Sequence, residues 1–243
     1  MYDIPEGKRA TRGKSVMNFI SLGAEEKITS ILPVPKDAKG KEGLSLMLVT
    51  KNGVGKRVAA SNFSDVRSSG IIAIRLDDSD LLVSASLVER GDSIVLVSAK
   101  GQAIRFKESD VREMGRSAVG VWVIKLAKGD FVIGAETIHK DASEPKLLVI
   151  SEKGFGKKTS LKEYKIQRRG GSGIKTAKVT AKTGGLMASA VVTPSDEEVV
   201  AISKKGQVIR TGLNEINESG RQTQGVRIMK LREGDALASL ICL

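Results

Sequence analysis

The chain is built from repeats with a period of about 52 residues. Four segments share one form: an apolar run, then Ser or Thr, two further residues, a glycine and a second short run. The segments are LMLVTKNGVGKR (46–57), IVLVSAKGQAIR (94–105), LLVISEKGFGKK (147–158) and VVAISKKGQVIR (199–210). Their glycines are Gly53, Gly101, Gly154 and Gly206, at successive intervals of 48, 53 and 52 residues. Self-similarity at a fixed period is typical of propeller-like and other repeat folds, in which each repeat is one structural unit.

A second form alternates with the first. Its copies are RSSGIIAIRL (67–76), RSAVGVWVIKL (116–126), RRGGSGIKTAKV (168–179) and RQTQGVRIMKL (221–231), with a degenerate copy RGKSVMNFISL (12–22) in which Val16 replaces the glycine. Each unit thus holds several short runs rich in Val, Ile and Leu, separated by glycine turns. This pattern predicts an all-β chain with a four-stranded antiparallel sheet per unit, arranged radially as propeller-like blades, and no helix longer than one turn.

We expect a single domain over residues 1–243. The predicted repeat units are 12–66, 67–115, 116–164, 165–216 and a partial unit at 217–243. Four copies of one form and five of the other cannot close a six-bladed circle. We therefore expect an incomplete ring with an open seam, flanked by strands near residues 14–22 and 225–243.

Basic residues exceed acidic ones, with 40 Lys and Arg against 28 Asp and Glu and a net charge of +12. Such an excess indicates an anionic partner, most often nucleic acid, the alternative being a solvated basic surface. Aromatic residues are few, with 5 Phe, 2 Tyr and 1 Trp. Because proteins that grip single strands stack bases on aromatic side chains, the composition favours duplex DNA held through its phosphates.

Cations recur at the same repeat positions, which in a ring of blades would place them on equivalent parts of the perimeter. Those that stand four residues after the first-form glycines are Arg57, Arg105, Lys158 and Arg210. Further predicted DNA contacts at or beside the repeat positions are Lys56, Lys157, Arg116, Arg221, Arg12 and Lys14. Because a merely solvated surface gives no reason for this recurrence, we interpret these cations as a belt that binds DNA phosphates.

The stretch QRRGGSG (167–173) joins two arginines to a glycine-rich turn. One interpretation is a flexible loop between blades, whose glycines permit positive φ. The other is a phosphate clamp, in which the glycines let backbone N–H groups approach the duplex while the arginines bind phosphate oxygens. The candidate residues are Gln167, Arg168, Arg169, Gly170, Gly171 and Gly173, with Lys175 just beyond the turn.

The sequence offers no catalytic constellation. GKRATRGKS (7–15) resembles a P-loop but has Lys8 where the first glycine is needed. His139 is the one histidine, which argues against a metal site and a catalytic triad. Acidic residues that recur at turn ends indicate a structural role. These are Glu26, Asp80, Asp130 and Asp235, with Thr183 breaking the series.

One cysteine excludes an internal disulfide framework, and no run of 18 apolar residues is present. The N-terminal residues lack the apolar core of a signal peptide. We therefore expect a cytoplasmic protein.

Taken together, the repeats and the QRRGGSG turn resemble the C-terminal domain of the bacterial DNA gyrase A protein. The signature of that family is a seven-residue box, Gln-basic-Arg-Gly-Gly-basic-Gly, and QRRGGSG matches six of the seven positions, with Ser172 in place of the second basic residue. The similarity runs along the whole chain, through IPEGKRATRGKSVMNFISL, EKITSILPV, IRFKESDVREMGRSAVGV, GFGKKTSLKEY and GRQTQGVRIMKL. It implies a β-pinwheel, six-bladed in the family, whose basic rim wraps duplex DNA.

The resemblance also implies a role as the non-catalytic module of an ATP-dependent type IIA topoisomerase that supports negative supercoiling. The implied partners are double-stranded DNA, the gyrase A catalytic domain and gyrase B. No cofactor is expected in this chain, because ATP and magnesium would serve other parts of the holoenzyme. Neither Tyr2 nor Tyr164 is a candidate for the strand-cutting tyrosine, since both lie in repeat positions.

Two departures from the family pattern leave alternatives open. The family has six copies of the first repeat form and this chain has four, so we expect the chain to begin about two repeats into the domain, without the catalytic half. The family's box lies in the first blade, so QRRGGSG is either a second box-like turn or a box in a different position. The rival functions are the equivalent C-terminal module of topoisomerase IV and a β-propeller scaffold for protein interactions.

Overall fold

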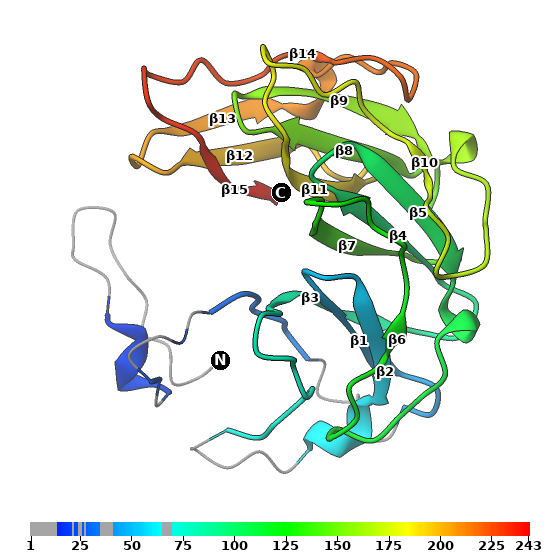
Figure 1. Cartoon of the computed structure of the whole chain (residues 1–243). Coiled ribbons are helices and arrows are strands. Elements are labelled where there is room, and N and C mark those ends of the chain that lie inside the picture. The colour runs from blue at the N-terminus through cyan, green and yellow to red at the C-terminus, as the bar shows by residue number, and fades with distance from the viewer. Residues whose placement is uncertain (1–13, 21, 24–25, 27, 35–40, 65–69) are drawn as a thin grey trace.

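A computed structural model describes residues 14–20, 22–23, 26, 28–34, 41–64 and 70–243 (Figure 1). The strands are β1 (Ser45–Thr50), β2 (Val54–Ala59), β3 (Leu82–Val88), β4 (Ser93–Ser98), β5 (Gln102–Lys107), β6 (Val121–Trp122), β7 (Val132–Ile138), β8 (Lys146–Ser151), β9 (Phe155–Ser160), β10 (Ile174–Lys175), β11 (Leu186–Val192), β12 (Glu198–Ser203), β13 (Val208–Gly212), β14 (Val226–Arg227) and β15 (Leu237–Cys242). Short 3-10 helices are η1 (Val16–Asn18), η3 (Ala60–Phe63), η4 (Glu108–Asp110), η5 (Leu161–Glu163) and η6 (Leu213–Glu215). Within the described residues, the prediction of an all-β chain whose helices are single turns is confirmed.

Each of the first three sheets is completed by a strand from the following repeat. The strand orders are β3-β1-β2-β6, β7-β4-β5-β10 and β11-β8-β9-β14. A hairpin of two long strands forms the middle of each sheet, the next strand in sequence lies on the inner side of the arc, and a two-residue strand lies on the outer side (Figure 1). The fourth sheet, β13-β12-β15, has three strands in the described part of the chain. Four-stranded antiparallel sheets are thus confirmed, but none of the sheets in the described residues takes all its strands from one predicted unit.

The turn inside each hairpin explains the spacing of the first repeat form. The Ser or Thr three residues before the glycine accepts, through its side-chain oxygen, a hydrogen bond from the backbone N–H four residues further on. The four bonds are Val54 to Thr50 (3.1 Å), Gln102 to Ser98 (3.2 Å), Phe155 to Ser151 (3.2 Å) and Gln207 to Ser203 (3.0 Å). At Gly154, φ is +77° and a Cβ atom would lie 2.3 Å from the carbonyl oxygen of Met229, so the turn requires glycine.

The recurring aspartates hold the loop that precedes each inner strand. Asp130 Oδ2 accepts a bond of 2.7 Å from the Ser98 hydroxyl, and its Oδ1 accepts bonds of 2.9 Å from the N–H groups of Lys100 and Phe131. Equivalent backbone bonds are accepted by Asp80 and Asp235. The predicted structural role of these acidic residues is therefore confirmed.

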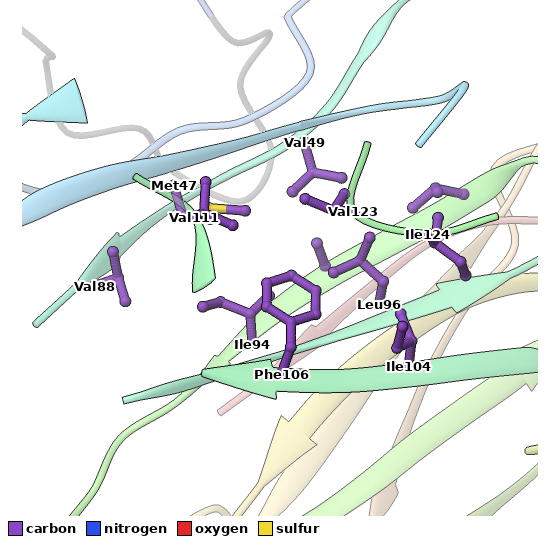
Figure 2. Packing of buried hydrophobic residues seen from close by; sticks show 12 residues of the cluster. Met47, Val49, Val88, Ile94, Leu96, Ile104, Phe106, Val111, Val123 and Ile124 are labelled. Atoms are coloured by element: carbon purple, nitrogen blue, oxygen red, sulfur yellow. The ribbon is translucent and has the colours of Figure 1, made fainter. Parts of the chain in front are cut away.

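The apolar core is divided among the junctions between neighbouring sheets. Figure 2 shows the first junction, where side chains of β1 face those of β4 and β5. Its members include Met47, Val49, Ile94, Leu96, Ile104 and Phe106, each at most 1% exposed. Similar clusters join the second sheet to the third and the third to the fourth. Because each sheet is buried by its neighbours, the blades depend on one another for stability.

Within the described residues, no sheet joins the fourth blade to the first. This agrees with the predicted open seam. The strand that was expected near Lys14–Leu22 is absent from the described part of that segment, so this expectation is wrong. Val16–Asn18 instead form η1, where the Ser15 hydroxyl accepts a hydrogen bond from the Met17 N–H at 3.3 Å. A serine at this position caps a helical turn, which competes with an extended backbone.

Glu136 lies on β7, an inner strand, and its carboxyl group is expected to make the stability of the fold sensitive to pH. Burial raises the pKa of Glu136 from 4.5 to about 7, although a 3.4 Å hydrogen bond from the Ser189 hydroxyl on β11 opposes the shift. Between pH 4.5 and 7 the folded state therefore binds more protons than the unfolded state. We expect the free energy of unfolding to fall by about 1–3 kcal/mol as the pH rises through this interval.

Urea unfolding of the parent and Glu136→Gln at a series of pH values measures this effect. The variant cannot ionise at this position, so its stability should change less between pH 4.5 and 7. Equal pH dependence of the two proteins would contradict the assignment.

Candidate nucleic-acid interface

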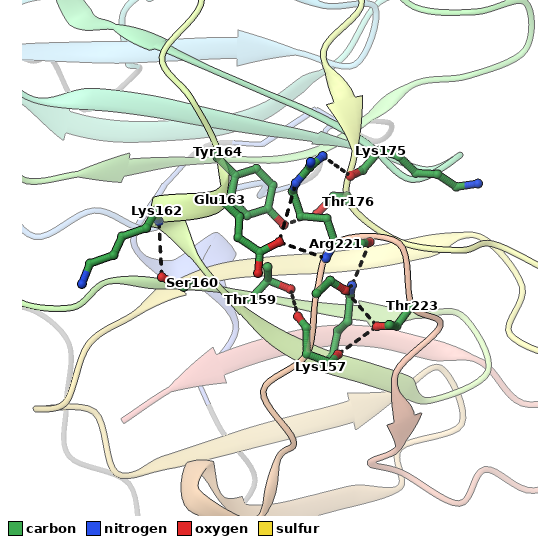
Figure 3. A network of polar contacts seen from close by, with 12 residues as sticks. Lys157, Thr159, Ser160, Lys162, Glu163, Tyr164, Lys175, Thr176, Arg221 and Thr223 are labelled. Atoms are coloured by element: carbon green, nitrogen blue, oxygen red, sulfur yellow. Dashed lines mark hydrogen bonds and ion pairs between the residues drawn. The ribbon is translucent and has the colours of Figure 1, made fainter.

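Two of the predicted DNA contacts, Lys56 and Lys157, are buried. Lys56 Nζ donates to the carbonyl oxygens of Gly115 (3.0 Å) and Ala118 (2.8 Å) and also to that of Arg116. Lys157 Nζ donates to the carbonyl oxygens of Gly220 (2.6 Å) and Arg221 (2.9 Å). Figure 3 shows the polar network around Lys157. Each lysine thus binds a turn of the following repeat. That turn leads into the two-residue outer strand, β6 or β14, that pairs with the lysine's own strand.

The environment of these lysines confirms that they are structural. Lys56 is 0% exposed and Lys157 is 1% exposed. Burial lowers the pKa of both ammonium groups, and that of Lys157 falls to about 8 even though the Glu163 carboxylate favours its charged form. Their assignment to the phosphate-binding belt is corrected: both ammonium groups are enclosed by protein carbonyls and cannot reach a phosphate.

Two of the cations four residues after the repeat glycines, Arg105 and Lys158, also join one blade to the next. Arg105 donates from Nε to the Ser93 hydroxyl (3.1 Å) and from a terminal nitrogen to the carbonyl oxygen of Leu161 (3.1 Å), in η5. In the next repeat, Lys158 Nζ donates to the carbonyl oxygen of Leu213, in η6. Burial lowers the pKa of both cations. Each of these two cations binds the 3-10 helix of the following blade, so the fold itself gives a reason for the recurrence, and the belt that binds DNA phosphates stays a prediction.

The other two cations at this repeat position differ in exposure. Arg57 lies 3.6 Å from Glu108, in η4, and its side chain is 19% exposed. Arg210 forms an ion pair with Glu198 on the neighbouring strand of the fourth sheet, and its side chain is 63% exposed. Of the four, Arg210 alone keeps most of its side chain open to solvent.

The QRRGGSG turn crosses the outer edge of the first two sheets. The N–H of Gln167 donates to the carbonyl of Arg105 at 2.8 Å, on β5. The N–H of Gly170 donates to the carbonyl of Val123 at 2.8 Å, just after β6. At Gly173, φ is +71° and a Cβ atom would lie 2.4 Å from the carbonyl oxygen of Ala103. The turn is therefore fixed in place on two blades, not a loose loop between them.

The two arginines of this turn have different surroundings. Arg169 donates from Nε to the carbonyl of Asp110 (2.7 Å) and from a terminal nitrogen to that of Trp122 (3.0 Å). Arg221 makes the equivalent bond to the carbonyl of Lys175 (3.1 Å) one repeat later. Arg168 is exposed, and its guanidinium has no hydrogen-bond or ion-pair partner among the described residues. Arg168 is thus available to a ligand, whereas Arg169 and Arg221 connect blades.

The remaining candidates vary in exposure. Lys175 is exposed, and its ammonium group points away from the polar network of Figure 3. Lys14 is exposed and Arg116 is partly exposed, whereas Arg12 lies outside the described residues. These positions stay predictions as DNA contacts.

A basic cluster around Phe155 was missed in the sequence. Lys182 Nζ lies 5.5 Å and Arg227 Cζ 5.1 Å from the centre of the Phe155 ring. The hollow beside them is also lined by Lys153, Lys230 and Arg232. Lys230 stands five residues after a second-form glycine, as Lys125 and Lys178 do in earlier repeats, so this recurrence was a signal for one member of the cluster.

In the part of the chain that is described, no group of three His, Cys, Asp or Glu side chains could hold a metal ion. No helix there is long and apolar enough to span a membrane. His139 Nδ1 lies 3.2 Å from the buried carboxylate of Asp92, so the one histidine has a local partner.

The chain is similar to known proteins along nearly all of its length. The family described as DNA gyrase C-terminal domain, beta-propeller, matches residues 1–35, 44–89, 92–139, 145–194 and 197–243. The DNA gyrase A protein of Staphylococcus epidermidis is 37% identical over 98% of this chain, and that of Mycolicibacterium smegmatis is 38% identical over 98%. The chain spans only 26% and 28% of these two relatives.

Solved structures show the same architecture. A DNA gyrase A C-terminal domain superposes with a TM-score of 0.84 at 28% identity, covering 96% of this chain and 76% of that one. A C-terminal domain of DNA topoisomerase IV superposes with a TM-score of 0.85 at 23% identity, covering 95% and 70%. At that identity, the second likeness shows the shared fold alone.

Proposed function

This chain belongs to the family of DNA gyrase C-terminal domains, and from that membership we propose that it binds and wraps duplex DNA as the C-terminal module of a gyrase A protein. The observation that carries the proposal is the QRRGGSG turn, which is fixed across two blades while Arg168 remains free among the described residues. Exposed cations continue along the same outer strands, at Lys175 and Arg227.

The mechanism is electrostatic and mechanical. Phosphates that meet exposed guanidinium and ammonium groups release their counterions, which favours binding without reading the base sequence. Bending 20–30 base pairs by 40–90° costs about 1–6 kcal/mol, and the phosphate contacts along the curved edge offset this cost. The carbonyl-bound lysines and arginines between blades keep the edge rigid while the duplex bends around it.

The module itself would not cut DNA. Strand passage, with ATP and magnesium, would belong to the gyrase A catalytic domain and gyrase B in a cytoplasmic holoenzyme associated with the chromosome. Wrapping would set the handedness of the DNA crossing that those parts act on, and so support negative supercoiling.

Ligation of nicked circular DNA in the presence of the protein tests wrapping directly. After the protein is removed, we expect topoisomers displaced in one direction relative to DNA that was ligated alone. Binding in a gel-shift assay without any displacement would refute wrapping. Decatenation without supercoiling by the reassembled enzyme would identify a topoisomerase IV module, and the absence of salt-sensitive DNA binding would favour a protein-interaction scaffold.

The two arginines of the turn should separate DNA binding from folding. Arg168→Ala removes an exposed charge, so the slope of log K against log salt should become shallower by about 0.9, with an unchanged thermal midpoint. Arg169→Ala removes two bonds to carbonyls between blades and should lower the free energy of unfolding by about 0.5–1.5 kcal/mol. Differential scanning calorimetry and salt titrations of both variants measure the two effects.

These single variants are matched, since both replace arginine by alanine in the same turn. An equal loss of stability in both would show that the turn as a whole is structural. An unchanged salt slope in Arg168→Ala would remove Arg168 from the interface.

A further inference from the structure

Trp122 is the chain's one tryptophan, and it lies on the outer edge beside the QRRGGSG turn. The residue is 62% exposed. Its backbone is held in place, because its carbonyl oxygen accepts a 3.0 Å bond from Arg169 and the adjacent carbonyl of Val123 accepts a 2.8 Å bond from Gly170. A large, mostly apolar side chain is thus presented to solvent from a fixed backbone position next to the turn that carries Arg168.

The repeat shows what this position does in the other blades. The outer strands β6, β10 and β14 have two residues each, and the second residue is Trp122, Lys175 and Arg227 respectively. These residues pair with the equivalent strands of their sheets, opposite Val54, Gln102 and Phe155. Equivalent register on equivalent strands gives the three side chains the same place on each blade. One row on the perimeter therefore carries two cations and one indole.

The hollows beside this row change in the same way. Next to Trp122 the lining includes Ile124, Leu126 and Gly170, with Lys125 as its one cation among the described residues. Next to Arg227, the repeat-equivalent hollow is lined mainly by cations around Phe155. Asn52 and Asp130 complete the lining of the first hollow, so Lys125 and Asp130 balance in charge there, whereas the third blade's hollow is strongly basic.

We propose that Trp122 packs against the sugars or base edges of the wrapped duplex. This contact lies beside Arg168 and does not depend on charge. This inference rests on the proposed function, because the occupant must be the same duplex that Lys175 and Arg227 bind through its phosphates. Apolar side chains that insert at base steps are a known means of bending DNA, and an indole offers a large contact area at a small cost in side-chain entropy.

Because the chain has a single tryptophan, its fluorescence reports on this position alone. Titration with a duplex of about 40 base pairs should quench or shift the emission at the same concentrations that saturate a gel-shift assay. Trp122→Ala should weaken binding about 5- to 10-fold with an unchanged salt slope, because no phosphate contact is lost. Trp122→Phe should retain most of the affinity.

Two matched variants in the same row separate the contributions. Lys175→Ala should make the salt slope shallower by about 0.9, and Trp122→Lys, which introduces the residue of the second blade, should make it steeper by about 0.9. Unchanged emission at saturating duplex, or full affinity of Trp122→Ala, would overturn the inference while leaving DNA binding intact. If no duplex binds at all, both the inference and the proposed function fail.

Discussion

Binding of duplex DNA to this domain will weaken about 10³- to 10⁵-fold when salt is raised from 50 to 200 mM, if about 6–10 phosphates are neutralised. The expectation follows from the exposed cations of the outer edge in the described residues. They include Lys125, Lys153, Arg168, Lys175, Lys178, Lys182, Arg227 and Lys230. Each phosphate contact contributes about −0.9 to the slope of log K against log salt. This term would dominate the affinity, so duplexes of unrelated sequence should bind with similar strength.

Fluorescence anisotropy with two labelled duplexes of scrambled sequence, over a series of salt concentrations, measures both expectations. Arg168→Ala is the sharpest control, because it removes one charge that forms no hydrogen bond or ion pair with the described residues. A dependence that is flat across this salt range would contradict a phosphate-bound duplex, and a strong preference for one sequence would contradict the backbone-dominated contact.

The parts of the fold that could be predicted from the sequence are those set by short-range interactions. The hairpin turns rest on bonds that span four residues, such as Val54 to Thr50, and on glycines with positive φ. Alternating apolar runs then give the strands between them. Which repeat supplies the outer strand of each sheet could not be predicted. The strands β6, β10 and β14 are only two residues long, and they pair with strands far away in the sequence.

The cations of the candidate site show why recurrence alone misleads. A cation at one repeat position is equally compatible with a DNA belt and with a bond to the next blade, and Arg105 and Lys158 make that bond. A signal for the buried lysines was nevertheless present. Three residues after the repeat glycines, Lys56 and Lys157 alternate with Ile104 and Ile209, and a position that accepts isoleucine is suited to burial.

Replacement of Lys157 will have the largest effect on stability of the changes considered. Lys157→Ala removes the donor to the carbonyls of Gly220 and Arg221 and leaves a cavity at a position that is 1% exposed. Leaving these carbonyls without their donor and opening a cavity lowers the free energy of unfolding by about 2–5 kcal/mol. Since single domains are stable by about 5–15 kcal/mol, the variant should unfold at a much lower urea concentration.

Lys157→Met and Lys153→Ala show which part of the loss comes from the hydrogen bonds. Methionine retains most of the volume, so Lys157→Met isolates the unpartnered carbonyls. Lys153 is exposed in the same hairpin and donates one bond of 2.6 Å to the carbonyl of Ala181, so its truncation should cost only about 0.5–1.5 kcal/mol. The folded fraction of Lys157→Met should keep the parent's salt slope for duplex binding, because this ammonium is not in the interface. Stability of Lys157→Ala within about 1 kcal/mol of the parent would contradict the structural role.

The pH dependence gives the same prediction an independent test. The pKa of Lys157 is about 8 in the folded state, against 10.5 for an ordinary lysine, because burial disfavours the charged form. Between these two values the unfolded chain binds more protons, so the contribution of Lys157 to the free energy of unfolding rises with pH across this interval. A neutral amine still has two N–H donors for the two carbonyls, which is why deprotonation removes the cost of burying charge without breaking the junction. Urea unfolding of the parent between pH 8 and 10.5 should show this rise, and the rise should be smaller in Lys157→Met, in which Lys56 and Lys158, whose pKa values burial also lowers, still contribute.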